Sequence, residues 1–157
     1  MYIPVASRFP PGSARFSLSA QHCSTAEGRE LTGNVRMKNL GFSPQLLRYF
    51  DDNSRRGRLE PADRLSEAEN PVCGDWLVLT ARVETQQLAQ VRFQARGCVA
   101  ATACAAALAE ALEGLTWEQA DGLDLRVAIL QRIERLPEAS GHAIELAVTA
   151  GQKLIQH

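Results

Sequence analysis

Residues 70–98 read "NPVCGDWLVLTARVETQQLAQVRFQARGC", and two stretches of this segment alternate apolar and polar residues. In 76–84 apolar side chains recur at every second position from Leu77 to Val83, and in 90–96 they recur from Val91 to Ala95. Alternation over such lengths is typical of strands with one buried face. The short connection between the two stretches predicts an antiparallel hairpin.

Both ends of this hairpin carry side chains that bind metals. Cys73 and Asp75 lie where the first strand begins, and Cys98 follows the second strand. Because an antiparallel hairpin brings these two ends together, we expect the three side chains to share one rim of the sheet. His142 is a fourth candidate, since it follows the helix break expected at Pro137. Thiolate, imidazole and carboxylate together suit zinc or iron.

A glycine adjoins each of these cysteines in the sequence. Gly74 and Gly97 let the backbone adopt a positive φ or approach a neighbour closely. An ordinary turn explains both residues equally well, so neither indicates chemistry.

The segments around the hairpin favour helices. Ser43 is a suitable N-cap for a short helix in 43–52 with Pro in its first turn, and a polar loop is expected over 53–69. Small residues predict a tightly packed helix over about 100–112, and Gly114 supplies its stop.

Two further helices are expected in the C-terminal part of the chain. The first lies in 124–136 and the second begins at about His142. The apolar side chains that share one face are Val127, Leu130 and Ile133 in the first helix, and Ile144, Val148 and Leu154 in the second. The order of helix, strands and then helices predicts an α+β domain, with several helices packed on a small antiparallel sheet.

Length and charge restrict the possible functions. A chain of 157 residues is long enough for one domain with a real core and too short to expect two. Its 17 basic and 18 acidic residues give a net charge of -1, so we expect neither a nucleic acid nor a membrane as partner. The longest apolar stretch, 97–114, is rich in alanine and too short to cross a bilayer.

The four cysteines and the N-terminal region indicate compartment and domain limits. The cysteines lack the repeated short spacing of a small disulfide scaffold, which favours a reducing cytoplasm. Residues 1–41 are expected to form a flexible extension, because Pro, Ser, Gly and scattered Arg show no sustained period. Cys23 lies in this extension and has no assigned role. The folded domain is expected over 42–157.

Several motifs together resemble the U-type iron-sulfur cluster scaffold family, with its NifU-like and IscU-like members. The family pattern runs from NPxCGD through a strand pair to Gly-Cys before a small-residue helix. Here "NPVCGD" at 70–75 is followed by "GCVAATACAAALAEALEGLTWEQA" at 97–120, and "LLRYFDDNSRRGRL" at 46–59 resembles the upstream helix and loop. The resemblance covers roughly 42–157 and is more specific than any single short motif.

This resemblance implies a fold and a function. The fold is a small antiparallel sheet of about three strands packed against several helices. The function is to assemble a transient 2Fe-2S cluster, from iron and from sulfur supplied by a cysteine desulfurase, and to pass it to recipient apoproteins. Such a protein binds and transfers its cargo and is not an enzyme.

The resemblance also implies roles for particular residues. Cys73 and Cys98 would be cluster or zinc ligands, and Asp75 would be a tuning carboxylate that binds iron more weakly than thiolate does. His142 matches the histidine that precedes the family's third cysteine, when positions are counted from the Leu-Pro pair at 136–137 without a gap. Ala143 stands where that third cysteine is expected.

The missing third cysteine weighs against full assembly activity. A methyl group can neither bind iron nor accept sulfur as a persulfide, so the zinc-dependent sulfur-acceptor role of SufU-like members is disfavoured too. Cys104 falls where the family usually has a small serine, and a buried packing role is favoured for it over that of a replacement ligand. The segment "LPEAS" at 136–140 departs from the LPPVK stretch that a dedicated chaperone recognises, so we do not expect that partner.

Three alternatives to a cluster scaffold stay open at this point. A degenerate homologue could retain zinc for structure or regulation. Two thiolates, a histidine and a water molecule could also form the site of a zinc-dependent hydrolase, with Asp75 or Glu145 as its base. Finally, the thiols could simply pack inside an interaction domain that holds no metal.

Overall fold

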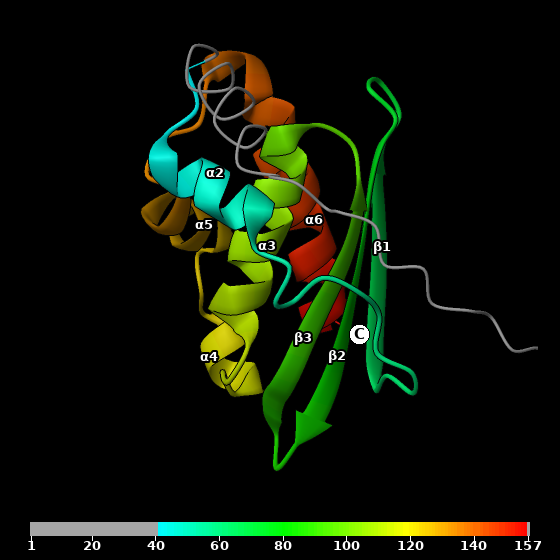
Figure 1. The fold of residues 1–157 in the computed structure, drawn as a ribbon. Helices are drawn as coiled ribbons and strands as arrows, with labels where there is room; N and C mark the ends of the chain where they lie inside the picture. The colour runs from blue at the N-terminus through cyan, green and yellow to red at the C-terminus, as the bar shows by residue number, and fades with distance from the viewer. Residues whose placement is uncertain (1–40, 157) are drawn as a thin grey trace, which may run out of the picture.

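The computed structural model describes residues 41–156, which form an α+β fold of a three-stranded sheet and five α-helices (Figure 1). The predicted extension, residues 1–41, lies outside the described residues except for Gly41. The elements, in chain order, are α2 (Pro44–Asp51), β1 (Arg64–Asn70), β2 (Asp75–Glu84), β3 (Gln87–Arg96), α3 (Val99–Leu112), α4 (Trp117–Asp121), α5 (Leu125–Ile133), a 3-10 turn (Glu138–Ser140) and α6 (Gly141–Gln156).

The sheet is antiparallel, in the order β1-β2-β3, and the hairpin expected from the alternating stretches is β2 and β3. The polar loop expected over 53–69 is wrong in its second half, because β1 occupies 64–70. The two buried side chains of β1 are the small Ser66 and Ala68, whereas Leu65 is exposed. The strand therefore lacks the large inward-facing residues by which strands are recognised in a sequence.

Small residues let α6 lie close to β1. The Ser66 hydroxyl donates a hydrogen bond of 2.8 Å to the carbonyl of Ala150, and that alanine is fully buried. A Cβ added at Gly151 would lie 2.8 Å from Cδ1 of Leu125, so this turn of α6 also packs tightly against α5. The small inward side chains of β1 are thus explained by the helix that covers them.

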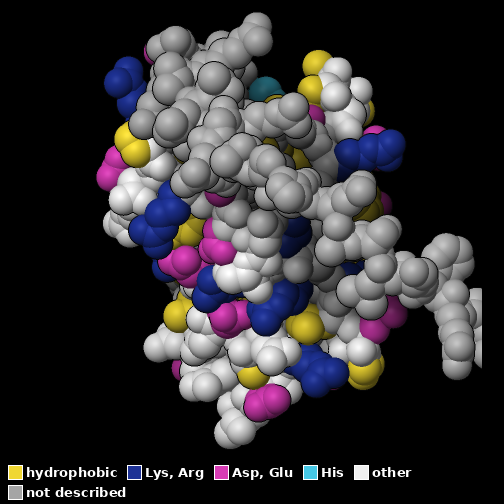
Figure 2. Space-filling view, in the orientation of Figure 1, with side chains coloured by type: hydrophobic (Ala, Val, Ile, Leu, Met, Phe, Trp, Pro, Cys, Tyr) yellow, Lys and Arg dark blue, Asp and Glu magenta, His cyan; other side chains and the backbone are white. Residues whose placement is uncertain are grey.

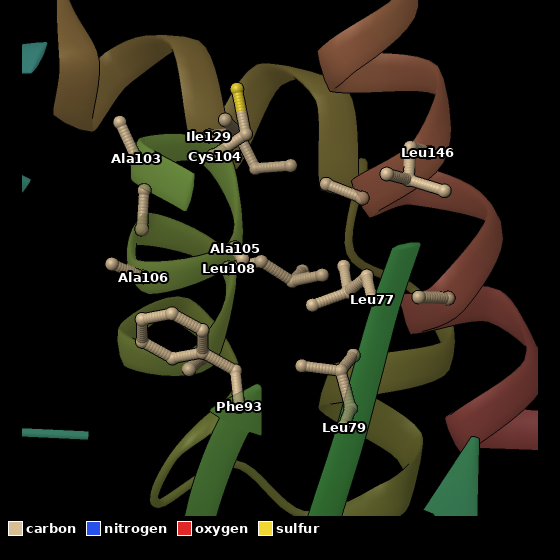
Figure 3. Close-up of a cluster of buried hydrophobic side chains, with 14 of the residues drawn as sticks. Leu77, Leu79, Phe93, Ala103, Cys104, Ala105, Ala106, Leu108, Ile129 and Leu146 are labelled. Carbon is tan, nitrogen blue, oxygen red and sulfur yellow. The ribbon is translucent and has the colours of Figure 1, made fainter. Parts of the chain in front are cut away.

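The hydrophobic core lies between the sheet and α3. Leu77, Leu79 and Phe93 point from the sheet toward α3, whose side chains are almost all buried (Figure 3). Cys104 is 0% exposed in this helix, which confirms its expected packing role. Because most residues of α3 are alanine, the helix approaches the sheet closely and places its N-terminus beside the hairpin ends.

Caps fix the ends of the helices that were expected. Ser43 is the N-cap of α2, where its hydroxyl accepts from the Leu46 N–H at 3.0 Å and donates to the Ile133 carbonyl at 2.5 Å. This second bond ties α2 to the end of α5. Helix α3 ends at Leu112, and Gly114 follows with a φ of 89°, which confirms its role as the stop.

The buried face of α5 differs from the expected one. Val127 is 46% exposed, and the helix ends at Ile133, where Glu134 adopts a φ of 63°, rather than at Pro137. Because α5 contacts α2, α3 and α6, apolar residues cover much of its circumference and no single stripe marks its inner side. The residues that it buries are Leu125, Ala128, Ile129 and Ile133. In α6 the expected stripe is correct, with Ile144 and Leu154 buried.

A half-buried ion-pair network ties the loop after α2 to the C-terminal end of α3. Glu113 accepts from Arg55 and from Arg92, each at 3.0 Å, and Glu110 accepts from the Tyr49 hydroxyl at 2.9 Å. Basic and acidic side chains are intermixed on this side of the molecule (Figure 2). Since each glutamate has more than one partner, the network holds the outer edge of β3 in place against α3.

The corrected face of α5 can be tested by two substitutions. Ile129→Ala removes a fully buried side chain, so we expect it to lower the free energy of unfolding by about 2–5 kcal/mol. Val127→Ala removes an exposed side chain and should change that free energy by no more than about 0.5 kcal/mol. Urea unfolding measures both values. If Val127→Ala lowered the free energy of unfolding more than Ile129→Ala does, the buried face of α5 would be the one predicted from the sequence.

Candidate metal centre

The turn between β1 and β2 sets the directions of Cys73 and Asp75. Asn70 and Asp75 are partners in the sheet, and the Gly74 N–H donates to the Asn70 carbonyl at 2.8 Å. Gly74 has a φ of 71°, a conformation that glycine adopts without strain. The turn leaves Cys73 exposed and directs Asp75 inward, where it is 6% exposed. Neighbouring positions of one turn therefore supply an accessible thiol and a buried carboxylate.

The pairing of β2 with β3 brings Cys98 to the same place. Trp76 pairs with Arg96, so the next two residues, Gly97 and Cys98, lie beside Asp75. A Cβ added at Gly97 would lie 2.6 Å from both Cγ and Oδ1 of Asp75, so only glycine leaves room for the carboxylate there. Cys98 is the N-cap of α3, and its Sγ accepts from the Ala101 N–H at 3.3 Å.

His142, the second residue of α6, completes the group. Its Nε2 lies 3.6 Å from Oδ2 of Asp75 and 3.8 Å from Sγ of Cys98. Ligand atoms of Cys73, Asp75 and His142 all lie within 4.8 Å of one another. The structure therefore brings Cys73, Asp75 and His142 together, from the turn before β2, from β2 and from α6. Cys98, at the N-cap of α3, lies outside this group of three and adjoins it through His142.

The electrostatics of the group suit a cation. Oδ2 of Asp75 is buried and has no hydrogen-bond partner, and a buried acceptor without a partner costs about 1–3 kcal/mol. Burial, and then the negative charge of Asp75, raise the pKa of the Cys98 thiol above its ordinary value. A cation bound between these groups would satisfy the free oxygen and favour the thiolate. The donor set of two sulfurs, one nitrogen and one oxygen fits zinc or iron.

Two other positions bear on the ligand set. Ala143, where the resemblance places a third cysteine, is 0% exposed beside His142. Burial raises the pKa of Cys104 to about 12, and this thiol is packed in the core. Cys104 is therefore no substitute for the missing ligand. Cys23 lies outside the described residues.

The contact between Gly97 and Asp75 was not predicted. The sequence allows a close approach or an ordinary turn at each glycine, and Gly74, with its φ of 71°, fits the turn. Gly97 instead makes room for the buried carboxylate, which depends on the register between β2 and β3. The sequence did offer one indication of this role. Gly97 directly precedes the candidate ligand Cys98, and it follows the strand that pairs with the start of β2.

Comparison with known proteins identifies the family. Residues 42–157 match the family model of the NifU-like N terminal domain. The chain belongs to this family. It is 30% identical over 114 residues to the iron-sulfur cluster assembly scaffold protein IscU 1 of Archaeoglobus fulgidus. This match covers 73% of this chain and 74% of that protein. It is 32% identical over 112 residues to the nitrogen fixation protein NifU of Nostoc, covering 64% of this chain and 36% of that protein.

Solved structures support the same fold. A candidate iron-sulfur cluster assembly scaffold protein for the SUF system, from Fervidobacterium islandicum, superposes with a TM-score of 0.60 at 16% identity, over 74% of this chain and 98% of that one. A NifU-like N-terminal protein from Brucella abortus gives 0.58 at 15% identity, over 73% and 91%. The family resemblance and the α+β fold expected from the sequence are thus confirmed. No helix within residues 41–156 is both long and apolar enough to span a membrane.

The positions of the described cysteines predict their order of alkylation in the metal-free protein. Cys73 is exposed and should react fastest with iodoacetamide at pH 8. Cys98 should react more slowly, because its raised pKa leaves less thiolate, and its rate should rise as the pH increases. Cys104 should react only as fast as the protein unfolds. Peptide mass spectrometry measures each rate, and modification of native Cys104 at the rate of Cys73 would contradict the buried assignment.

Proposed function

We propose that this protein is an iron-sulfur cluster assembly scaffold homologue that binds a transient 2Fe-2S cluster, or iron or zinc, and takes part in cluster assembly or transfer. Cys73, Asp75, Cys98 and His142 are the proposed ligands. The observation that carries the proposal is that Cys73 and His142 lie around one buried carboxylate oxygen of Asp75 that has no hydrogen-bond partner, with Cys98 beside His142. The names of its relatives support the same role.

The exposure of the site suits a cargo that is bound and then released. Both thiols are accessible, so a donor or a recipient protein can reach them without opening the core. Asp75 contributes an oxygen ligand, which holds iron less firmly than a third thiolate would. We propose that the protein binds and transfers its cargo rather than acting as an enzyme, with a cysteine desulfurase as sulfur donor and apoproteins as recipients.

A second candidate function is that of a zinc-binding structural or regulatory homologue. It is favoured by Ala143, whose methyl group leaves two thiols rather than three in the described site. Two sulfurs, one nitrogen and one oxygen complete the four-coordinate shell of a single zinc ion. The weaker alternative is a zinc-dependent hydrolase. It requires an open coordination position and a free base. Glu145 is paired with Arg126, so Asp75 would have to act as the base instead of as a ligand.

The test is reconstitution of anaerobically purified protein with iron, cysteine, a cysteine desulfurase and a thiol reductant, which reduces the persulfide sulfur to sulfide. We expect bound iron with an equal amount of acid-labile sulfide, measured by metal analysis and visible absorption. Cys98→Ser should reduce metal retention more than about tenfold, because even an outer-shell partner of a ligand contributes that much. Cys104→Ser is the matched control and should retain the metal, since that thiol is packed in the core.

The other outcomes discriminate among the alternatives. One zinc ion per chain, with no sulfide acquired, would favour the structural or regulatory homologue over the scaffold. Protein that retains neither iron nor zinc would contradict both. Equal behaviour of Cys98→Ser and Cys104→Ser would show that the ligand assignment is wrong.

A further inference from the structure

The two edges of the sheet differ in how their backbone groups are bonded. On the outer edge of β3, the Phe93 N–H donates to the Arg55 carbonyl at 3.0 Å, and the Phe93 carbonyl accepts from the Gly57 N–H at 2.8 Å. The Val91 N–H donates to the Glu113 carboxylate at 3.0 Å. Loop and side-chain groups thus close this edge.

The register of the sheet determines which residues face the opposite edge. The backbone groups of Phe93 point away from β2, so its partner Leu79 directs its own groups toward β1. Leu79 pairs with Ser66, which therefore bonds within the sheet. Because the direction alternates along a strand, the N–H and C=O groups of Leu65, Glu67 and Glu69 point outward from β1.

Within residues 41–156, the outward backbone groups of β1 have few partners. Among residues 41–156, the Glu67 carbonyl alone has a partner, the Lys153 ammonium at 3.0 Å, and both side chains are exposed. An exposed lysine is a weak cap that a better hydrogen-bond partner can displace. Figure 1 shows β1 at the edge of the sheet, with α6 along its inner face. A strand with unpaired groups at an edge is a template for a further strand.

Cavities flank both ends of this edge. One, of 160 Å³, lies between β1 and α6 near Asn70, and its lining mixes the apolar Ala68 and Leu146 with His142 and the acidic Glu69 and Glu145. The other, of 380 Å³, lies at Arg64 and is lined by the apolar Trp117 and Ile155 and by the acidic Glu118 and Asp121. Side chains on the helix-facing side of an added strand could fill both. The first cavity shares His142 with the candidate metal centre.

The charges at this edge select one kind of occupant. Glu67 and Glu69 are exposed on the side of β1 that faces away from α6, where the Glu67 carboxylate also accepts from the Trp76 indole N–H. In the register that pairs all of β1 with a second copy of itself, Glu67 would lie opposite Glu67, and like charges directly opposite destabilise strand pairs. Basic residues opposite these glutamates stabilise the pairing instead.

We propose that the β1 edge binds an extended segment of a partner protein in which basic side chains alternate with apolar ones. The segment adds a fourth strand to the sheet. Its basic residues lie opposite Glu67 and Glu69, and its apolar residues enter the cavities beside α6. A role for this partner in exchanging cargo at the metal centre would rest on the proposed function. The addition of the strand itself needs no metal.

The test uses a peptide of alternating arginine and valine, with blocked ends and the 7-residue length of β1, added to the metal-free full chain. We expect hydrogen exchange at the amides of Leu65, Glu67 and Glu69 to slow on binding. Glu67→Pro removes one outward N–H that β2 does not use, so it should weaken binding about tenfold or more. Glu67→Gln keeps this N–H and should weaken binding less.

Two control peptides keep the proposal falsifiable even if Glu67→Pro does not fold. One has the same composition in scrambled order, and the other has N-methylated alternate amides; both should bind at least about tenfold more weakly. Equal binding of either control would overturn the proposal. Protection of the three amides before any peptide is added would also overturn the proposal. Protection that depends on protein concentration would indicate that a second copy of the chain covers the edge, and protection that does not would indicate that residues 1–40 cover it. Because no metal is present, failure here leaves the reconstitution result unaffected.

Discussion

The arrangement of the site depends on one close contact, between the buried carboxylate of Asp75 and the backbone at Gly97. The first residue of β2 turns inward, and the residue after β3 has no side chain to obstruct it. Cys73 precedes that carboxylate by two positions and Cys98 follows the glycine, so both thiols are placed by the same contact. A larger residue at Gly97 would displace the carboxylate and separate the two thiols, while leaving the four proposed ligands in the sequence.

The contact also explains why the centre suits a loosely held cargo. Asp75 is the buried member, and an oxygen ligand with an unsatisfied lone pair attracts a cation. The two thiols stand at the surface, and His142 approaches from a helix on the other side. Ala143 is buried beside His142 and offers no thiol to the site. The β1 edge and its cavity adjoin His142, which would bring a docked strand to the same rim.

Features that are decided by neighbouring residues in the sequence could be predicted from it. The β2 and β3 hairpin, the caps at Ser43 and Gly114, and the packing of Cys104 follow from alternation, cap chemistry and small-residue composition. The convergence of the site also followed, because both hairpin ends carry candidate ligands. Its assignment as a ligand set is still a prediction.

The missed features are set by tertiary packing. β1 buries only Ser66 and Ala68, because α6 lies so close that larger residues would not fit. Val127 is exposed because three neighbouring helices decide which side of α5 is buried. The role of Gly97 depends on the register between two strands, which alternation alone does not determine.

X-ray absorption at the zinc edge of the zinc-loaded full chain tests most directly whether these four side chains hold one ion. The account predicts two sulfur neighbours at about 2.3 Å and two nitrogen or oxygen neighbours at about 2.0 Å. A first shell of four nitrogen or oxygen atoms, or of one sulfur or four, would contradict it.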